Sequence, residues 1–431
     1  MTTPEKIPDM PTIQVQDLCR VCGGELVEIL SLGEQRLNGF PVNTEALQTI
    51  PKAPIVLCVC RGCSLAQLKH TVPPDWLYRQ YWYRSAINET MVQELGTIVK
   101  EACVQVPLGA TDYVLDIGAN DGTLLTAYRD QPYPPIRVAV EPALNLRDTL
   151  SQQTDILIPD YFPTEAIDRL RGRFKIITAI ACAYDLEDPV GFFAKIAELL
   201  HPLGVAIIQF QDLAQQIEST AFDNLVHEHL EYYTLGSLLG IVKRVGLEAT
   251  RVQHTPINGG SLRVTLRPTP RQSFQDQSVV DQLHLESDLG LSPGKIRQGQ
   301  LGAFYQFRQR IHDIRAQIRG IVQEQLDLGE PVDWYGASTK SNCSLQVLGL
   351  GPGVIRQVVD RNPLKHGRLT LTGIPIVGED VWRADPAKVT VLGIWQFAGQ
   401  VYQREARFLS RGGTFLVPMP HAALVREGAA V

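Results

Sequence analysis

The chain lacks a strong charge imbalance and lacks a long apolar run. Its 431 residues carry 40 Lys and Arg against 46 Asp and Glu, a formal net charge of −6. This mild excess of acid indicates neither a nucleic-acid footprint nor a membrane-surface patch. No apolar run reaches the roughly eighteen residues that span a bilayer, and residues 1–17 have no apolar core of signal-peptide length. We therefore expect a cytoplasmic protein with neither nucleic-acid nor membrane partners.

Disulfide bonds are not expected, because cysteines in the cytoplasm are more often thiols or metal ligands. Four of the eight cysteines form two C-x-x-C turns, in CRVCGG and CVCRGC. Two such turns supply the tetrahedral sulfur shell that zinc prefers and leave no position for water. We predict a structural Zn²⁺ bound by Cys19, Cys22, Cys60 and Cys63. Four unrelated thiols are the alternative, and Cys58 is a competitor for the position of Cys60.

One apolar strand runs directly into a turn of small residues. Residues 113–121 read YVLDIGAND, Gly122 follows, and Glu141 ends the next apolar strand in VAVEP. Gly118 removes the Cβ that would block a ligand, while Asp116 and Glu141 can bind polar groups such as ribose hydroxyls. The pattern is typical of class I methyltransferases that bind S-adenosylmethionine. The predicted donor site comprises Asp116, Gly118, Asn120, Asp121, Gly122, Glu141, Pro142 and Ala181.

Two other interpretations of this turn remain open. It is also compatible with an ordinary turn of a doubly wound sheet, or with a dinucleotide site. The sequence G-A-N-D-G, however, lacks the three spaced glycines that pack a pyrophosphate against a helix.

The order of apolar segments predicts an α/β protein of two or three domains, since the chain is too long for one hydrophobic core. We expect a small zinc-binding module over 1–75 and a doubly wound, Rossmann-like methyltransferase sheet over 76–255. A second Rossmann-like α/β domain should follow over 256–431. Apolar residues from Leu301 to Ile321 recur at mostly three- and four-residue spacing, which predicts one long amphipathic helix, packed between domains or, less favoured, in a homodimer.

The segment FDNLVHEHLEYYTL, residues 222–235, is unusually dense in polar and aromatic side chains. Methyl transfer to carbon needs a base beside a C–H group next to a carbonyl, and histidine suits that task because its pKa lies near neutrality. One of His227 and His229 could therefore be the base and the other a structural partner, and Glu228 and Tyr232 of the same segment complete the catalytic candidates. A metal cluster or a polar patch without chemistry is the alternative, although histidines two residues apart sit badly on one helix face.

These motifs together resemble the sugar C-methyltransferase family. The similarity rests on CRVCGG with CRGCSLAQL, DIGANDGTLL, FDNLVHEHLEYYTL, NGGSLRV, YGASTKSN, VVDRNPLKHGR and IPIVGED, in that order along nearly the whole chain. The resemblance implies an amino-terminal zinc module, a central S-adenosylmethionine domain and a carboxyl-terminal Rossmann-like domain. It also implies methylation of a keto-deoxy sugar, carried on a nucleoside diphosphate such as thymidine diphosphate, at the carbon beside the ketone.

The resemblance also implies roles for individual residues. The family's catalytic histidine falls on His229, which would remove the proton beside the ketone so that an enolate carbon can take the methyl group. Glu228 would orient the sugar or stabilise the oxyanion. The sugar nucleotide would be held mainly by the last domain, whose turn is suited to phosphate. The substrate-binding candidates are Gly260, Ser261, Ser338, Thr339, Lys340 and Asn342.

The chain departs from the family pattern at three places. Val226 replaces a tyrosine before H-E-H, so that Tyr232 or Tyr233 would have to supply a hydroxyl. Ser341 replaces a glycine after G-A-S-T-K, and residues 181–184 replace an asparagine-rich turn. These changes keep O- or N-methylation open as the main rival function.

Two further hypotheses come from different classes. Asp360 stands where a Rossmann domain places its ribose-binding acid, with Gly336 at the preceding turn, which suggests a nicotinamide-dependent oxidoreductase. The turn lacks the further glycines of such a site. The other hypothesis is a catalytically silent scaffold that binds zinc and a nucleotide.

Overall fold

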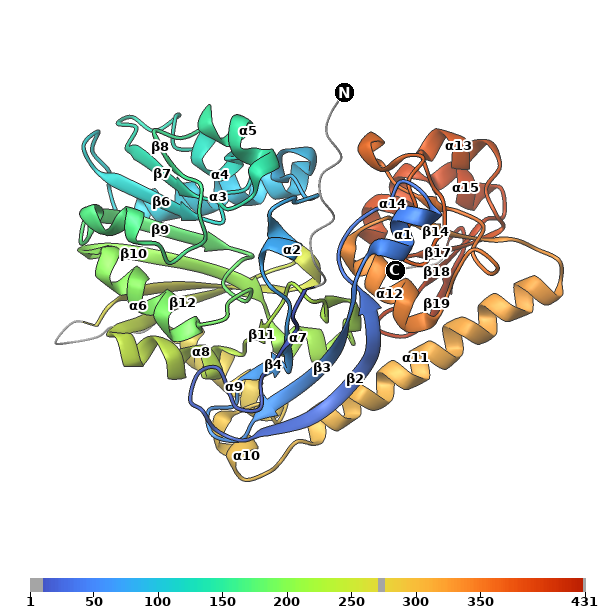
Figure 1. Ribbon diagram of the computed structural model, residues 1–431, viewed down its shortest axis with the longest axis horizontal. Coiled ribbons are helices and arrows are strands. Elements are labelled where there is room, and N and C mark those ends of the chain that lie inside the picture. Colours follow the sequence, from blue (N-terminus) through green and yellow to red (C-terminus); the bar gives the residue numbers. More distant parts are fainter. Residues whose placement is uncertain (1–10, 270–275, 429–431) are drawn as a thin grey trace.

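The computed structural model describes residues 11–269 and 276–428. Residues 1–10, part of the segment for which no signal peptide is expected, lie outside the described residues. The chain forms three α/β or β parts that meet along one long helix (Figure 1). Within the described ranges, no helix is long and apolar enough to cross a bilayer.

The amino-terminal part is an antiparallel β module. Its four-stranded sheet has the order β11-β4-β3-β2, and β1 pairs with β5 in a separate ribbon. The bounds are β1 Gln14–Val15, β2 Leu26–Arg36, α1 Thr44–Thr49, β3 Lys52–Cys60, β4 Ala66–Leu68, β5 His70–Thr71, α2 Asp75–Tyr78 and β11 Glu231–Tyr232. Because β11 comes from the segment with the catalytic candidates, the zinc module and that segment share one sheet.

The central part is a seven-stranded sheet of order β12-β13-β10-β9-β6-β7-β8. The five strands from β10 to β8 are parallel, and their apolar runs are buried as expected for a sheet covered on both faces. The strands are β6 Tyr113–Ile117, β7 Ile136–Val140, β8 Ile156–Ile158, β9 Phe174–Ile180, β10 Leu200–Gln211, β12 Leu247–Thr255 and β13 Ser261–Pro268. The helices are α3 Glu89–Gln105, α4 Thr123–Thr126, α5 Arg147–Ser151, α6 Pro189–Leu199, α7 Leu213–Glu218, α8 Leu235–Val242 and α9 Gln277–Asp288.

The central sheet extends past the predicted domain boundary at residue 255. Strand β13 pairs antiparallel with both β10 and β12, in register from Ala206 opposite Leu266 to Gln211 opposite Ser261. The motif NGGSLRV therefore forms the turn and strand that complete this sheet, where the sequence suggested a break between domains.

The carboxyl-terminal part is a second α/β unit, as predicted. Its sheet has the order β16-β15-β14-β17-β18-β19, parallel except for the edge strand β19. The strands are β14 Val332–Tyr335, β15 Val358–Val359, β16 Ile376–Val377, β17 Val389–Leu392, β18 Thr414–Val417 and β19 Ala423–Val425. The helices are α12 Thr339–Leu348, α13 Glu379–Ala384, α14 Ala398–Arg404 and α15 Ala406–Ser410. The mixed α/β fold class predicted from the sequence is thus confirmed.

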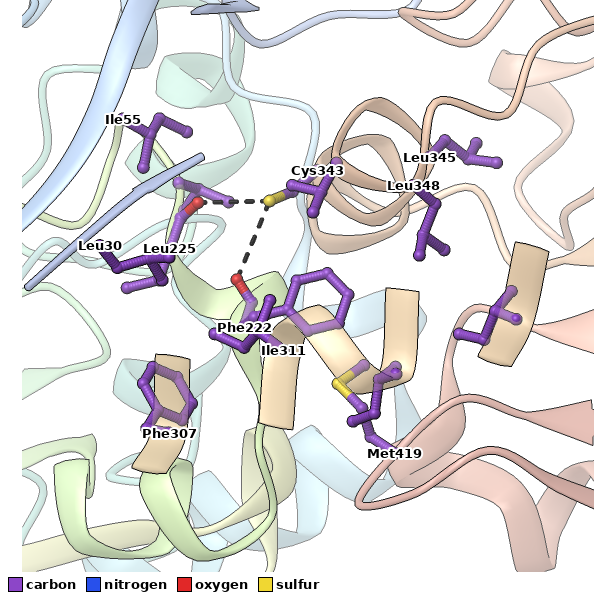
Figure 2. Packing of buried hydrophobic residues seen from close by; sticks show 14 of the residues in the cluster. Leu30, Ile55, Phe222, Leu225, Phe307, Ile311, Cys343, Leu345, Leu348 and Met419 are labelled. Atoms are coloured by element: carbon purple, nitrogen blue, oxygen red, sulfur yellow. Dashed lines mark hydrogen bonds between the residues drawn. The ribbon is translucent and has the colours of Figure 1, made fainter. Parts of the chain in front are cut away.

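The predicted long helix is α11, Gly302–Asp327, which follows the short helix α10, Pro293–Arg297. Its buried face contacts β2 of the zinc module, α7 of the central part, and α12 and β14 of the last part, so its predicted place between domains is confirmed (Figure 1). The shared core is built from all parts of the chain (Figure 2), and it includes Leu30, Ile55, Phe222, Leu225, Phe307, Ile311, Cys343, Leu345, Leu348 and Met419.

Candidate active site

The four predicted zinc ligands come together at one point. The sulfur atoms of Cys19, Cys22, Cys60 and Cys63 lie within 4.8 Å of one another, and the Cys19–Cys63 pair is 3.5 Å apart. A tetrahedral Zn²⁺ with bonds of about 2.3 Å holds its sulfur ligands about 3.8 Å apart, so these thiols fit zinc. Glycines at 24 and 62 make room, because a Cβ at either would lie 3.1 or 3.2 Å from the sulfur of Cys22.

Cys58, the competing ligand, is absent from this cluster. Its side chain is buried, and burial raises the pKa of its thiol to about 11. The spacing argument that preferred Cys60 is therefore confirmed.

A cavity of about 360 Å³ lies where the central and carboxyl-terminal parts meet. It opens at the carboxyl ends of β6 and β7, which is where open α/β sheets bind ligands. Predicted site residues in its lining are Asp116, Gly118, Asn120, Glu141, Pro142, Ala181, Glu228, His229, Ser338, Thr339 and Lys340. Candidates for donor, base and substrate contacts thus share one space.

The donor turn has the geometry that its sequence predicts. Gly118 has a φ of 67°, and a Cβ there would lie 3.0 Å from Cys182, so a side chain has no room. The carboxylate of Glu141 accepts hydrogen bonds from the backbone N–H groups of Asn120 and Ala143, each at 2.8 Å. Each carboxylate oxygen keeps a lone pair for a further donor, such as a ribose hydroxyl.

The negative charge of Asp116, at the end of strand β6, is only partly stabilised by its surroundings. Asp116 is buried, and its Oδ1 accepts a hydrogen bond of 2.7 Å from the hydroxyl of Thr178. Burial raises the pKa of its carboxyl to about 7, a value that a bound cation would lower. These side chains fit a ligand with a ribose and a positive charge, as S-adenosylmethionine has.

Two predicted donor residues lie outside the cavity lining. Asp121 accepts from the backbone N–H of Ala86 at 2.9 Å and from the Thr123 hydroxyl at 2.6 Å, so it ties the turn to the preceding segment. Gly122, with a φ of 82°, precedes α4, and a Cβ there would lie 2.6 Å from Gln153. Both residues shape the turn and have no surface on the cavity.

His229 faces the cavity with a defined tautomer. Its Nδ1 lies 3.0 Å from the carbonyl oxygen of Asn224 and must carry the hydrogen, because a carbonyl only accepts. The lone pair of the neutral ring is then on Nε2. Burial, followed by the charge of Lys340, lowers the pKa of His229 to about 3, so the ring is neutral near pH 7. The ring also packs edge-on against Tyr184, with centroids 4.5 Å apart.

Glu228 also lines the cavity, and burial raises the pKa of its carboxyl to about 7. A substantial share of this group is therefore protonated at neutral pH and can donate a hydrogen bond to a substrate oxygen.

The structure does not bring His227 or Tyr232 to the cavity. The Nε2 of His227 lies 2.9 Å from the carbonyl oxygen of Ala53, and the Tyr232 hydroxyl donates to the carbonyl of Asn224 at 3.4 Å. The chain turns between the two histidines, because the N–H of His229 donates to the carbonyl of Val226 at 3.0 Å, and the two rings therefore meet different partners. Tyr233 is also buried away from the cavity, and its hydroxyl has no partner among the described residues.

Hydroxyl groups reach the cavity from elsewhere, because the tyrosines that line it are Tyr78, Tyr81, Tyr83, Tyr161 and Tyr184. The Tyr78 hydroxyl donates to the backbone carbonyl of Glu228 at 2.6 Å. Sequence reasoning missed all five. The run of aromatic residues in PPDWLYRQYWYRS was the available signal for the first three.

Three substrate candidates lie outside the lining. A Cβ at Gly260 would overlap the side chain of Gln215, and the Ser261 hydroxyl donates to the carbonyl of Ile257 at 2.9 Å. Asn342 accepts from the N–H of Leu371 at 2.9 Å and donates to the carbonyl of Gly39. Gly260 and the side chains of Ser261 and Asn342 thus hold loops in place and lie outside the cavity lining.

The family departures also have defined places. Val226 lines the cavity, so an apolar wall stands where the family has a tyrosine. Ser341 points into the last domain, where its hydroxyl donates to the carbonyl of Gly393 at 3.2 Å. Asn258, Gln211 and Asp185 also line the cavity, and sequence reasoning did not single them out.

Three family models match the chain in the order of its three parts. The model described as "Putative zinc binding domain" matches residues 19–78, "Methyltransferase domain" matches 87–252, and "C-methyltransferase C-terminal domain" matches 256–420. The C-methyltransferase NovU of Streptomyces niveus is 28% identical over 418 residues, which cover 95% of this chain and 97% of NovU.

Two solved structures resemble part of the chain. A chain of the complex between the Haloferax volcanii Trm112 methyltransferase activator and a methyltransferase has a TM-score of 0.37 at 14% identity, covering 44% of this chain and 96% of its own. The 1,6-didemethyltoxoflavin-N1-methyltransferase of Burkholderia thailandensis has a TM-score of 0.33 at 15% identity, covering 43% and 81%. These similarities are too low to support a functional argument.

The donor turn, the cavity and the family matches define a methyltransferase that uses S-adenosylmethionine and binds zinc. More particularly, the chain carries a zinc-binding domain, a methyltransferase domain and a C-methyltransferase C-terminal domain in that order, and it is similar over nearly its whole length to the C-methyltransferase NovU.

Proposed function

We propose that this enzyme methylates the carbon beside the ketone of a keto-deoxy sugar carried on a nucleoside diphosphate, with thymidine diphosphate as the expected carrier. The observation that carries the proposal is His229, a neutral histidine whose Nε2 lone pair is free in the same cavity as the donor turn. Transfer to oxygen needs little more than alignment. Transfer to carbon needs a base, and the neutral ring of His229 supports that role.

Each half of the cavity has a separate task in this proposal. Glu141 would hold the ribose hydroxyls of the donor, and Asp116 would face its positive end. S-adenosylmethionine, when bound, supplies an electrophilic methyl group. The first turn of α12, with Ser338 and Thr339, would hold the sugar nucleotide on the opposite wall.

The chemistry of the protein residues is proton transfer and charge stabilisation. Nε2 of His229 would take the proton from the carbon beside the ketone, and the protonated carboxyl of Glu228 would donate a hydrogen bond to a sugar oxygen. The apolar walls at Val226 and Leu186 limit water near the enolate carbon.

Hydrogen exchange tests this proposal without the donor. The enzyme is incubated in D₂O with a panel of nucleoside diphosphate 4-keto-6-deoxy sugars, and mass spectrometry follows deuterium entry beside the ketone. We expect exchange on one sugar, methyl gain on the same sugar when S-adenosylmethionine is added, and a loss of both by about 10²- to 10⁴-fold in His229→Asn.

The control is binding of S-adenosylhomocysteine, which His229→Asn should retain if its fold is intact. Methyl gain without exchange would replace this proposal by O- or N-methylation. No exchange and no methyl gain on any sugar, with donor binding present, would remove the sugar nucleotide as substrate class.

A further inference from the structure

Lys340 is a half-buried cation at the junction between the central and carboxyl-terminal parts. It lies in the first turn of α12 and lines the cavity. Its Nζ donates a hydrogen bond of 3.0 Å to the carbonyl oxygen of Asn258, which belongs to the loop between β12 and β13. An ammonium group has three hydrogens, so this bond leaves Lys340 with hydrogens for other acceptors.

The negative charge nearest to this role belongs to Asp223, which is itself buried and makes a contact across the same junction. Asp223 of the central part is fully buried, and its Oδ2 accepts a hydrogen bond of 3.0 Å from the indole N–H of Trp395 in the last part. Its Oδ1 has no hydrogen-bond partner among the described residues. Burial lowers the pKa of Lys340, and the negative charge of Asp223 opposes that effect.

The position of the ammonium group is set by an unusual backbone. Asn258 has a φ of 58° and a ψ of 20°, a left-handed conformation that few residues other than glycine adopt. Its carbonyl oxygen accepts from both Lys340 and the side-chain amide of Gln211, each at 3.0 Å. A carbonyl oxygen held by two donors is fixed in direction, and it holds Lys340 in turn.

Lys340 and His229 face the same cavity from opposite sides of the junction. They are close enough for the charge of Lys340 to lower the pKa of the His229 ring. A base and a cation so arranged match the demands of enolate formation, because the carbonyl oxygen lies only two bonds from the carbon that loses its proton. Negative charge then develops on an oxygen near the base.

We propose that Lys340 is a further catalytic residue, whose ammonium group binds the ketone oxygen and stabilises the enolate, with Asp223 and Asn258 as positioning residues. The inference rests on the proposed function. It gives Lys340 a role at the reacting carbon in place of the diphosphate contact expected from the sequence, and it leaves the diphosphate to Ser338 and Thr339.

The step balances within the proposed reaction. The C–H bond beside the ketone breaks, its proton moves to Nε2 of His229, and its electron pair forms the enolate, whose oxygen Lys340 contacts. The enolate carbon later forms a bond to the donor's methyl group, the methyl–sulfur bond breaks, and the sulfur keeps that electron pair. The proton on His229 then leaves to solvent.

The test compares Lys340→Met with a matched control, Lys388→Met, because Lys388 is an exposed lysine of the same domain outside the cavity lining. Two quantities are measured, deuterium exchange beside the ketone without donor and the affinity for thymidine diphosphate alone. We expect Lys340→Met to slow exchange by about 100-fold, as for the loss of one oxyanion donor, and to bind thymidine diphosphate as the wild type does. Lys388→Met should change neither.

Asp223→Asn provides a second test that keeps the ammonium group but removes the negative charge of Asp223. It should lower kcat more than it changes KM, because the substrate contacts remain while the cation loses its position. If Lys340→Met fails to bind S-adenosylhomocysteine, its fold is damaged, and Asp223→Asn then decides the matter.

Two results would overturn the inference. Unchanged exchange in Lys340→Met would remove the oxyanion role, and a large loss of thymidine diphosphate affinity with normal exchange would return Lys340 to the diphosphate. A wild-type enzyme that exchanges no keto sugar would instead sink the proposed function, and this inference with it.

Discussion

In both the central and the carboxyl-terminal sheet, a carboxylate after the second strand accepts hydrogen bonds from the backbone of a turn, an arrangement called here a carboxylate clamp. Only the clamp of the central sheet lies in the lining of the cavity described above. After β7, Glu141 accepts from the N–H groups of Asn120 and Ala143. After β15, Asp360 accepts from the N–H of Ala337 at 2.8 Å, and in both sheets the clamped turn directly follows the first strand. The two clamps differ in what lies beside the carboxylate.

The carboxyl-terminal clamp is closed by the protein itself. The Nζ of Lys365 lies 3.5 Å from the Asp360 carboxylate and donates to the carbonyl of Ala337 at 2.6 Å. The ring of Phe40, from the zinc module, lies 4.8 Å from the same ammonium group. A nucleotide would have to displace both groups. An acid after a strand therefore indicates a ribose site only where no cation of the same chain neutralises it, and this argues against the nicotinamide alternative.

The first prediction compares matched substitutions of the two clamp carboxylates, Glu141 and Asp360. Glu141→Gln should lower the affinity for S-adenosylhomocysteine by about 100-fold, because the amide cannot accept from both backbone N–H groups and both ribose hydroxyls. That loss corresponds to one or two hydrogen bonds to a charged group. Asp360→Asn, the matched change, should leave this affinity within about twofold. Isothermal titration calorimetry measures both.

Equal losses in the two variants would mean that the clamps act through overall stability and not through the ligand. Thermal unfolding of each variant, recorded without ligand, separates the two explanations.

The second prediction concerns the glycines that open the two turns. A Cβ at Gly336, where φ is 103°, would overlap the side chain of Ile394, whereas a Cβ at Gly118 would lie 3.0 Å from Cys182. We expect Gly336→Ala to lower the free energy of unfolding by about 2 kcal/mol and to spare donor affinity in the fraction that stays folded. Gly118→Ala should destabilise by less, about 1 to 2 kcal/mol, from the left-handed backbone and a small shift of Cys182, but should weaken the donor complex.

Urea unfolding and calorimetry with S-adenosylhomocysteine give the two quantities for each variant. If Gly336→Ala also weakened the donor complex, the turn at Gly336 would affect the donor turn at Gly118. The two turns would then not act independently, as we expect them to.

The donor turn, the zinc ligands and α11 could be predicted because each depends on residues close in sequence. Cys19 and Cys22 share one turn, and Gly118 and Asn120 share another. The apolar face of α11 repeats with the helical period. Local spacing determines such features, whatever the rest of the chain does.

The walls of the cavity could not be predicted, because they join segments far apart in the sequence. Tyr78 forms a hydrogen bond with Glu228, and Trp395 forms one with Asp223. The partners are 150 and 172 residues apart in the sequence. Strand β11 pairs with β4 of the zinc module, although its sequence suggested only a reactive segment. Sequence periodicity carries no information on such pairings, which depend on how whole domains pack.

The third prediction uses the pH dependence of donor affinity to distinguish the region of Asp116 and Glu141 from the region of Asp360. Burial raises the pKa of Asp116 from 3.8 to about 7 in the donor-free protein. The folded state therefore binds more protons than the unfolded state between these values, and the stability contributed by this group falls as pH rises from about 4 to about 7. A cationic donor would favour the ionised form, so its binding should release a proton.

The affinity for S-adenosylmethionine should therefore rise by up to about tenfold between pH 6 and pH 8. Asp116→Asn should flatten this dependence, whereas Asp360→Asn should leave it as in the wild type, because Asp360 lies outside the cavity lining. Glu228, whose pKa is also about 7, lines the same cavity, and Glu228→Gln tests its share. Calorimetry in buffers of different ionisation enthalpy counts the protons released. A pH dependence that persists in Asp116→Asn but disappears in Glu228→Gln would assign the coupled proton to the substrate side of the cavity and not to the donor turn.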